Sequence, residues 1–345
     1  MFELKILTFI IPAYNSEAFL EKCIDSMLAP EILDRLEIVV VNDGSADRTA
    51  EIAQSYCSRY PDTVRLISQE NRGHGGALNT GCAAATGKYL KVIDADDWVQ
   101  TENLPAYLDF LAECQADVVL THHRTIDIGT GEMKYWRSYP ARFGRAYTLD
   151  GIMADWKSFD RSLTFHGITY RTEFYREKGI RLSEKVFYED HEFATFPCCH
   201  ATLVTPCDLY LYEYRIGDVT QSVSDENQLR RISHTETVIR RMIDGMKELP
   251  EGAGREYAAM KTHGLVMSYL TTVLLAQPDR AAGRRDAGEM MERCKAEAPR
   301  VWQITNKKYS MLLALNRLHI KKSALDRILR SRLYNRLRGN HDFNA

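Results

Sequence analysis

Short apolar runs alternate with helical patterns through the N-terminal part of the chain, and this alternation constrains the fold more than any other feature of the sequence. The apolar runs lie at 4–11, 36–41, 64–68 and 89–93. Helical patterns lie between them at 17–28, 47–56 and 77–85. Because continuous apolar strands that alternate with helices pair in parallel and are covered on both faces, the sequence predicts a Rossmann-like α/β sheet.

A cluster of polar residues follows each of these predicted strands. The clusters are Tyr14-Asn15, Asp43, Asn71–Gly76 and Asp94–Asp97. In α/β sheets the carboxyl ends of parallel strands lie at one edge, and ligands bind there. We therefore expect the clusters to line one binding site.

The segment Asp94-Ala95-Asp96-Asp97 gives the strongest indication of chemistry. Carboxylates crowded at a strand end repel one another unless a cation or a helix terminus compensates their charge. Oxygen ligands that leave coordination positions open suit a Mg²⁺ or Mn²⁺ ion that also binds a diphosphate. The alternative is an acidic turn capping a helix that begins near Thr101, but the position after a buried strand favours the metal.

Asp43 and the glycine-rich segment are weaker signals. A carboxylate at the end of a strand can accept hydrogen bonds from a ribose, although Asn42-Asp43-Gly44 is also a common turn. The segment Asn71–Gly76 lacks the Gly-Lys-Ser/Thr ending of a P-loop. We expect a loop whose glycines let the backbone approach a ligand, with Arg72 or His74 meeting a phosphate. His74 itself is expected to be exposed and not catalytic.

Glu189 and Asp190 precede an apolar spacing, Phe193 and Phe196, that predicts the start of a helix. The helix dipole keeps carboxylates of the first turn ionised. An ionised Asp190 in a cleft can act as a general base. The alternative is that acidic residues here only favour the start of the helix.

The rest of the chain divides into a mixed region and a helical one. Further strands are expected near 117–120, 163–170 and 209–215, with a helix near 189–199. From about 228 onward the pattern is helical, with breaks near 250–254, 278–283 and 299. We predict a sheet domain at 1–220 and a helical region at 221–345, whose helices shape an acceptor site or a homo-oligomer interface.

The C-terminal segment is basic although the whole chain is nearly neutral. The 345 residues carry a net charge of -2, whereas 301–345 contains ten Lys or Arg and two Asp. As a helix, the segment would gather leucines and an isoleucine on one face, namely Leu325, Ile328, Leu329, Leu333 and Leu337. It could rest on an anionic membrane or pack against the acidic remainder of the chain. Nucleic acid is not an expected partner, because no binding motif accompanies the charge.

Cysteine usage and hydropathy indicate the compartment. The eight Cys form no Cys-x-x-Cys pair and are expected to be buried thiols of a reducing environment. We find no signal peptide, and the longest apolar stretch, 265–276, is about half a membrane span. We therefore expect a cytoplasmic protein, peripheral on the inner face of the plasma membrane if the basic tail binds lipid.

Taken together, these segments resemble glycosyltransferase family 2, the inverting nucleotide-sugar enzymes of the GT-A fold. The resemblance spans roughly residues 4–215 and rests on motifs that occur in the family's order. They are Phe9–Asn15, Val41–Ser45, Asn71-Arg72-Gly73, Asn79-Thr80-Gly81, Asp94–Asp97 and Glu189-Asp190. One departure is Ala77-Leu78-Asn79, where many relatives carry Ala-Arg-Asn, so that any contact made by that arginine is either missing here or supplied by Arg72.

The resemblance also implies roles for individual residues. Those expected around the nucleotide base and ribose are Pro12, Tyr14, Asn15, Glu17 and Asp43. Arg72, Asp94 and Ala95 are expected to bind the nucleotide-sugar. Asp96, in the DXD motif, would be the direct ligand of Mn²⁺ or Mg²⁺, and Asp190 would be the catalytic base.

The implied activity is transfer of a sugar from a nucleotide donor, with UDP favoured, to a hydroxyl of a glycan or lipid-linked acceptor during synthesis of a cell-surface polysaccharide. Two alternatives stay open at this point. A nucleotidyltransferase would also use paired carboxylates, but the first strand–helix turn holds Pro12–Asn15 instead of a Gly-rich, basic signature. The other alternative is a non-catalytic nucleotide-sugar-binding protein. The presence of four acidic residues, Asp43, Asp94, Asp96 and Asp190, argues against it.

Overall fold

The structure, a computed structural model, describes residues 5–217 and 225–329. The chain divides into two compact units, each described here by itself. The first comprises Met1–Asp218 together with Glu251–Gly254. The second comprises Val219–Pro250 and Arg255–Ala345.

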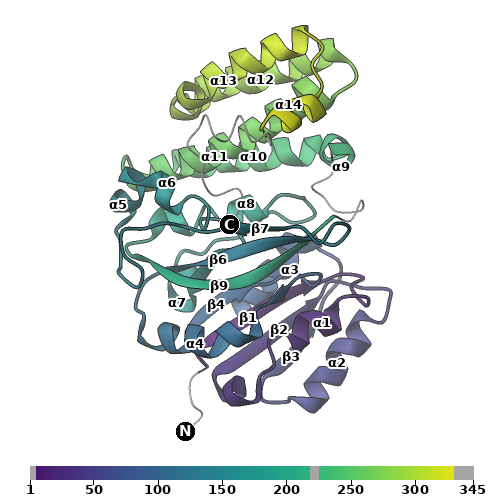
Figure 1. Cartoon of the computed structure of the whole chain (residues 1–345), viewed down its shortest axis with the longest axis vertical. Helices are drawn as coiled ribbons and strands as arrows, with labels where there is room; N and C mark the ends of the chain where they lie inside the picture. Colours follow the sequence, from purple (N-terminus) through teal and green to yellow (C-terminus); the bar gives the residue numbers. More distant parts are fainter. Residues whose placement is uncertain (1–4, 218–224, 330–345) are drawn as a thin grey trace. The chain divides into compact units, whose positions relative to one another are not determined.

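The first unit is built around one sheet (Figure 1). Its strands follow the order β3-β2-β1-β4-β8-β6-β9-β5, and β7 pairs with β6 off this path. The strands are β1 Leu7–Ala13, β2 Leu36–Asn42, β3 Val64–Ser68, β4 Tyr89–Val92, β5 Trp98–Val99, β6 Val118–Asp127, β7 Met133–Trp136, β8 Ile168–Arg171 and β9 Val204–Ile216.

The strands β3, β2, β1 and β4 are parallel throughout, as the apolar pattern predicts. β8 then pairs antiparallel with β4 and with the first part of β6. β7 pairs antiparallel with the second part of β6, whereas β9 runs parallel to β6. The predicted α/β fold of the GT-A type is confirmed, with a parallel half that carries the strand-end clusters and a mixed half.

Helices cover both faces of the parallel half (Figure 1). Phe9 and Ile11 of β1 pack in one core with apolar residues of α1, α2 and α4. On the opposite face, Val39 and Val41 of β2 pack against Ala77 of α3. Alternate residues of a strand point to opposite faces, so a strand covered on both sides is apolar at every position.

The helices of the first unit differ in extent from the sequence patterns. They are α1 Leu20–Asp25, α2 Thr49–Arg59, α3 Gly73–Ala84, α4 Leu104–Glu113, α5 Leu149–Ala154, α6 Trp156–Phe159, α7 Thr172–Glu177 and α8 Asp190–Phe193. The expectation of a loop through Asn71–Gly76 is wrong, because α3 already begins at Gly73. The helix expected near 189–199 is reduced to α8 and a short turn at Cys198–His200.

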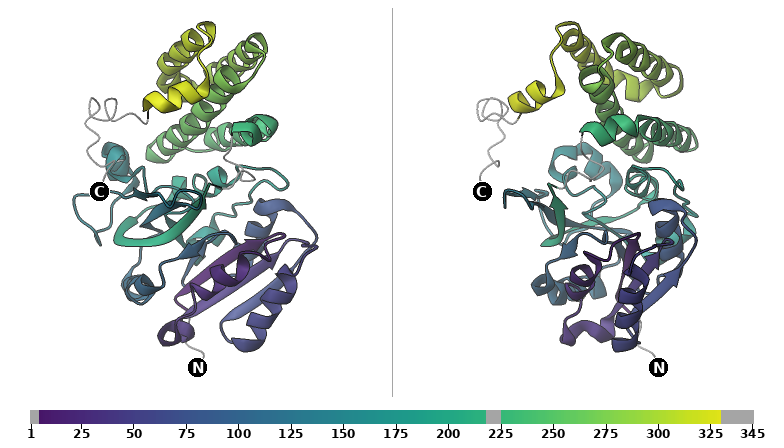
Figure 2. Two further views of the ribbon diagram at one scale, coloured as in Figure 1. Left: turned by 45° about the vertical axis from the view of Figure 1, so that its right-hand side comes forward. Right: turned by 90° about the vertical axis from the view of Figure 1, so that its right-hand side faces the viewer.

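The second unit is helical in its described part. Its helices are α9 Asp225–Arg230, α10 Ile232–Lys247, α11 Ala253–Thr271, α12 Arg280–Glu297, α13 Pro299–Arg317 and α14 Lys322–Leu329, with a π-helical turn at Thr272–Ala276. Helices α12 and α13 pack side by side (Figure 2). Of the apolar face predicted for the basic tail, only the Leu325 side chain is described; those of Ile328, Leu329, Leu333 and Leu337 lie outside the described residues.

Within the described ranges, no helix combines the length and apolar character that a membrane crossing requires. All eight cysteines are free thiols, and six of them are buried, namely Cys23, Cys82, Cys198, Cys199, Cys207 and Cys294.

Candidate active site

The parallel half of the sheet brings the predicted polar clusters to one edge. Ala13, Asn42 and Ser68 are register partners at the ends of β1, β2 and β3. β4 ends beside β1, where Ile10 pairs with Val92. The residues that follow these strands therefore emerge at the same edge.

Two of the predicted nucleotide residues hold the loop that follows β2. The Asn15 N–H donates to Ser45 Oγ at 3.0 Å, and Asn15 Oδ1 accepts from the Ala46 N–H at 2.9 Å. Glu17 Oε2 accepts from the Arg48 N–H at 3.0 Å. Pro12 is buried within β1, whereas the Tyr14 side chain is 55% exposed next to this loop. Asn15 and Glu17 thus shape the edge, and both are exposed there together with Tyr14.

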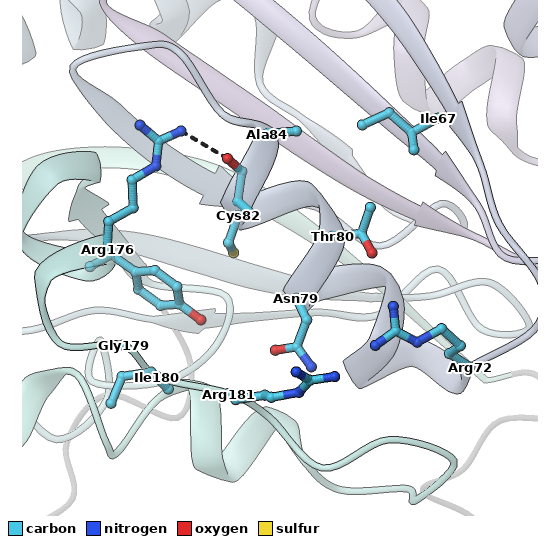
Figure 3. A pocket seen from close by; sticks show the side chains of 12 residues that line it. Ile67, Arg72, Asn79, Thr80, Cys82, Ala84, Arg176, Gly179, Ile180 and Arg181 are labelled. Atoms are coloured by element: carbon cyan, nitrogen blue, oxygen red, sulfur yellow. Dashed lines mark hydrogen bonds between the residues drawn. The ribbon is translucent and has the colours of Figure 1, made fainter.

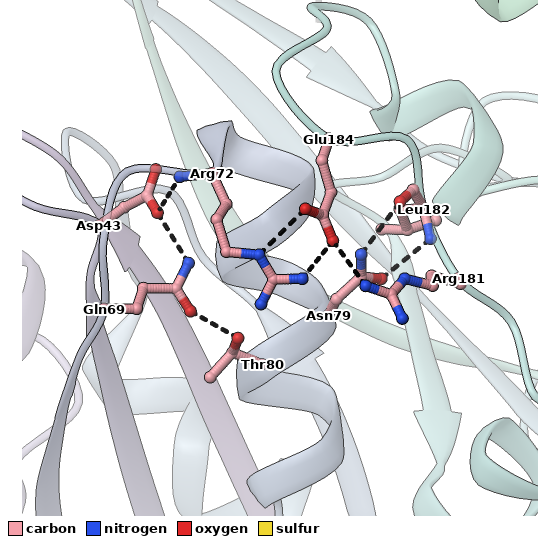
Figure 4. Close-up of polar contacts among 8 residues, drawn as sticks. All are labelled: Asp43, Gln69, Arg72, Asn79, Thr80, Arg181, Leu182 and Glu184. Carbon is pink, nitrogen blue, oxygen red and sulfur yellow. Dashed lines mark hydrogen bonds and ion pairs between the residues drawn. The ribbon is translucent and has the colours of Figure 1, made fainter.

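Asp43 is buried and held by the segment that follows β3 (Figure 4). Its Oδ1 accepts from Gln69 Nε2 at 2.7 Å and from the Arg72 N–H at 2.9 Å. Gln69 Oε1 in turn accepts from the Thr80 hydroxyl on α3. These bonds fix the carboxylate between the loops that follow β2 and β3.

The Arg72 guanidinium is engaged by Glu184, which also binds Arg181 (Figure 4). Arg72 Nε donates to Glu184 Oε2 at 3.0 Å, and a second bond completes the pair. Leu78, at the position where relatives carry arginine, is fully buried in α3. The nucleotide contact predicted for Arg72 therefore stays a prediction. The contact that the structure describes, with Glu184, joins two distant parts of the chain.

His74 lies between two carboxylates from distant parts of the chain. Its Nε2 is 2.9 Å from Asp94 Oδ1, and its Nδ1 is 2.5 Å from Glu189 Oε1. Desolvation by itself would lower the pKa of His74, but the charges of Asp94 and Glu189 outweigh it and raise the pKa well above the ordinary value. An imidazolium with a proton on each nitrogen satisfies both acceptors. The expectation of a simply exposed His74 is wrong.

Glycine at position 75 allows Glu189 to reach His74. A side-chain carbon there would lie 2.1 Å from the Ser183 carbonyl oxygen and 2.8 Å from Glu189 Cγ. Asn79, about one turn of α3 after Gly75, exchanges two hydrogen bonds with the backbone of Leu182 (Figure 4). The glycine-rich segment therefore packs against residues 182–189 of the chain. The sequence predicts only that its glycines let the backbone approach a ligand.

The three aspartates after β4 have different environments. The charge of His74 lowers the pKa of Asp94 even though burial opposes this. Asp97 is buried and accepts from the Tyr212 hydroxyl at 2.6 Å and from the Arg215 N–H at 2.7 Å; burial and then the charges of Asp96 and Asp94 raise its pKa well above the ordinary value. Asp96 is 39% exposed, with Arg215 Nη1 at 3.8 Å. Asp96 is therefore the most accessible of the three.

Asp190 lies at the start of α8, directly after Glu189 and after Tyr188, which has a left-handed φ of 73°. Desolvation lowers the pKa of His166 to about 4, and the charges of Asp94 and Asp190 both oppose that shift. The pKa of Tyr214 is raised by burial and then by the charges of four aspartates, Asp97, Asp94, Asp190 and Asp96. Glu189, the residue before Asp190, is joined through His74 to Asp94 of the DXD segment. The structure thus holds the Glu189-Asp190 pair next to the DXD segment.

A buried lysine holds the backbone of the 166–168 segment by hydrogen bonds. Lys91 of β4 is fully buried, and its Nζ donates to the carbonyls of His166 at 2.8 Å and Ile168 at 3.2 Å. Burial lowers its pKa from 10.5 to about 7. Lys91 thereby positions the His166 backbone beside the aspartates.

The donor set suits a hard divalent ion shared with a substrate. Within residues 5–217 and 225–329, no three His, Cys, Asp or Glu side chains are grouped so as to hold an ion by themselves. Mg²⁺ typically binds through one or two carboxylates plus substrate phosphates. The accessible Asp96 carboxylate at the strand-end edge fits an ion that is bound by a carboxylate together with substrate phosphates.

A separate pocket of 740 Å³ is lined by α3, by Ile67 of β3 and by the 175–181 segment (Figure 3). Of the predicted site residues, Arg72 alone lines it. Arg176, which also lines it, donates to the carbonyl of Ala83 at 3.0 Å. The strand-end edge, where the acidic clusters meet, is therefore the better candidate for the active site.

The sequence pattern does not reveal three participants in this site. It predicts an exposed loop at His74, an acidic neighbour of Asp190 at Glu189, and only a strand at Tyr212. Tyr212 both accepts from the Asp94 N–H at 3.1 Å and donates to Asp97. The signals available were the position of His74 within the glycine motif and that of Glu189 beside the predicted base, and neither reveals the pairing.

The sheet topology and the acidic strand end define the class of GT-A glycosyltransferase folds. Structural comparison supports this: the crystal structure of S. aureus TarS 1–349 aligns with a TM-score of 0.62 at 20% identity, covering 91% of this chain and 87% of that one. TarS in complex with UDP-GlcNAc aligns with a TM-score of 0.57. At these identities the likeness concerns the fold.

Sequence comparison gives the family. Residues 8–176 match glycosyl transferase family 2. The chain is 40% identical over 114 residues to the uncharacterized glycosyltransferase EpsJ of Bacillus subtilis (strain 168), covering 33% of each chain. It is 26% identical over 250 residues to the succinoglycan biosynthesis protein ExoO of Rhizobium meliloti (strain 1021), covering 70% of each. Residues 8–176 thus carry a domain of glycosyltransferase family 2, as the motifs predict, and the match to EpsJ spans only a third of that protein's length.

Proposed function

We propose that this protein is an inverting glycosyltransferase that moves a sugar from a nucleoside-diphosphate sugar to a hydroxyl group. The observation that carries the proposal is the position of His74, whose two ring nitrogens bind Asp94 of the DXD segment and Glu189 next to Asp190. Through this bridge, Asp94, which is expected at the diphosphate, is held close to the segment that carries Asp190, the expected base.

The proposed reaction is a direct displacement. Asp190 takes the proton of the acceptor hydroxyl while that oxygen forms a bond to the anomeric carbon. The bond from that carbon to the diphosphate oxygen breaks on the opposite face, and the diphosphate leaves with the electron pair, which inverts the configuration. A base in place typically contributes about 10²–10⁴-fold in rate, and orienting the two substrates contributes roughly 7–11 kcal/mol.

The donor side of the proposal rests on the loops after β1, β2 and β4. Asp43, fixed by Gln69 and the Arg72 N–H, would accept hydrogen bonds from a ribose or base edge. The same edge includes Tyr14, Asn15 and Glu17 after β1 and Asp94 and Ala95 after β4, and Pro12 is the last residue but one of β1. We favour a UDP-sugar, in line with the TarS complex with UDP-GlcNAc. Asp96 would hold Mn²⁺ or Mg²⁺, which when bound offsets the negative charge of the diphosphate.

We further propose a glycan or lipid-linked acceptor in the synthesis of a cell-surface polysaccharide. The name of ExoO, a succinoglycan biosynthesis protein, supports that class. Two further proposals rest on the sequence alone. One is action at the cytoplasmic face of the plasma membrane through the basic segment 301–345. The other is a homo-oligomer built on the helical unit.

A panel of nucleotide sugars with Mn²⁺, scored for slow donor hydrolysis and for release of nucleoside diphosphate, tests the proposed function without knowledge of the acceptor. With an accepted donor and acceptor, Asp190→Asn should lose transfer by about 10²-fold or more and keep donor affinity. Asp150→Asn, which also removes a first-turn acid of a short helix, is the matched control and should leave both unchanged.

Three results would contradict the proposal. Wild-type turnover in Asp190→Asn would place the base elsewhere. Release of pyrophosphate would indicate nucleotidyl transfer. Binding of donors without any hydrolysis or transfer would indicate a non-catalytic protein.

A further inference from the structure

A row of four aromatic rings runs from the edge of the sheet to the candidate active site. The ring centroids of Trp136 and His123 are 5.8 Å apart with 2° between the ring planes. His123 and His166 are 5.1 Å apart, and His166 and Tyr214 are 4.4 Å apart at 25°. We call these four side chains the ring row. Each ring contacts the next, so the row is continuous from β7 through β6 to β9.

The inner end of the ring row is at the DXD segment. The His166 ring contacts the Tyr212 ring, with centroids 4.8 Å apart, and the Tyr212 hydroxyl accepts from the Asp94 N–H and donates to Asp97. The outer end is open: the Trp136 side chain is 40% exposed, whereas His123 behind it is buried. The ring row therefore connects a solvent-accessible indole with the DXD segment, which His74 joins to Glu189 beside the proposed catalytic base.

The two faces of β7 differ in what they contact. Trp136 and Lys134 are two residues apart on one face, the face of His123, and the Lys134 side chain is 40% exposed. Tyr135 points to the opposite face, where its ring contacts Tyr210 at 5.5 Å. Tyr135 is 43% exposed, close to the value for Trp136. The two side chains are thus matched in exposure but lie on opposite sides of the strand.

The chemistry of an exposed indole beside a charged side chain fits a saccharide. A sugar ring has a flat C–H face that packs on an aromatic ring, and its hydroxyls need polar partners at the rim. Ligand sites combine aromatic lining with a few polar groups in this way, and aromatic rings provide a large contact area with little loss of conformational freedom.

We propose that Trp136, at the open end of the ring row, binds a saccharide unit of the acceptor and directs the acceptor toward Asp190. The inference rests on the proposed function, because an acceptor exists only if the chain transfers sugars. The occupant is a carbohydrate and not a second copy of the chain or a peptide, because the row leads to the residues that would deprotonate a sugar hydroxyl.

The test compares Trp136→Ala with Tyr135→Ala and Trp136→Phe in the full chain. The probes are p-nitrophenyl glycosides of oligosaccharides built from glucose, galactose, N-acetylglucosamine or rhamnose, long enough to extend along the four rings, used as acceptors with the donor identified by hydrolysis. Trp136→Ala should raise the KM for the glycoside by about tenfold, the effect expected when an aromatic anchor is truncated. Its donor hydrolysis should stay unchanged, Trp136→Phe should recover most of the affinity, and Tyr135→Ala should behave as wild type.

Several outcomes would overturn the proposal. An unchanged glycoside KM in Trp136→Ala, or an equal rise in Tyr135→Ala, would remove Trp136 as a specific contact. A change of sedimentation coefficient in Trp136→Ala without a change in KM would identify the surface as an interface between copies.

If no glycoside accepts sugar although the donor is hydrolysed, saturation-transfer NMR with the same glycosides decides. A signal that is lost in Trp136→Ala supports the site, and no signal with wild type overturns it. Failure of the proposed function is distinct, because wild type would then hydrolyse no donor.

Discussion

The Cα atom of Gly75 lies so close to Glu189 that any side-chain carbon at position 75 would stand 2.8 Å from Glu189 Cγ. The same carbon would meet the Ser183 carbonyl oxygen at 2.1 Å, and a backbone group cannot rotate away as a flexible side chain can. Close packing of the glycine motif against 183–189 is thus a condition for the bridge that His74 makes between Glu189 and Asp94.

Gly75→Ala should therefore displace the 183–189 segment. We expect it to lower the free energy of unfolding by about 1–3 kcal/mol, as overpacking typically does, and to reduce donor hydrolysis. Urea unfolding and the hydrolysis assay measure the two effects. Gly151→Ala is the control, because a carbon added there would contact only Thr148 Oγ1, at an ordinary 3.5 Å. Equal stability of the two variants would show that the segment adjusts freely.

His74→Gln should uncouple Asp94 from Glu189, because an amide cannot carry the charge that both carboxylates face. We expect a loss of about 1–3 kcal/mol in the free energy of unfolding near pH 6, together with a lower kcat and a changed pH–rate profile. His200→Gln, at an exposed histidine, is the control.

The pH dependence of that loss has a definite sign. The pKa of His74 is higher in the folded state, so its contribution is complete below the ordinary value of 6.5 and declines as the pH rises through the folded pKa. The stability difference between wild type and His74→Gln should therefore shrink in alkaline buffer. A difference that grows with pH would show that the ring is neutral in the folded protein.

Lys91 should give the opposite slope. Its pKa is about 7 in the folded state against an ordinary 10.5, so the unfolded chain binds more protons between these values and stability rises with pH there. Lys91→Met lacks this group. The free energy of unfolding of wild type relative to Lys91→Met should increase from pH 7 to pH 9, as urea titrations at each pH can measure. A flat difference would show that Lys91 keeps its ordinary pKa.

Asp96→Asn should weaken metal-dependent donor binding. We expect calorimetric affinity for the accepted donor in Mn²⁺ to fall by about tenfold or more, equivalent to ~1.4 kcal/mol, and chelation of the metal to have the same effect on wild type. Asp155→Asn, at an exposed residue outside the site, should bind as wild type. Donor affinity that is independent of both Mn²⁺ and Asp96 would exclude Asp96 as the ligand.

The elements of the parallel half could be predicted because their signals are local. Unbroken apolar runs specify strands covered on both faces, and polar residues at their ends mark where each strand stops. Asp43 and Asp94 follow β2 and β4 as expected, and parallel pairing places them at one edge. The short strands β5 and β7 and the extension of β6 to Asp127 were not predicted, because they depend on pairing with β9 and with one another.

The order in which the chemical groups follow the strands can be predicted from local patterns, because apolar periodicity and turn residues act over a few positions. Which groups meet depends on the folded chain: His74 with Asp94 and Glu189, Arg72 with Glu184, and the ring row with Tyr212. These pairings join segments far apart in the chain, and their geometry depends on close packing, such as that at Gly75, which no local pattern encodes.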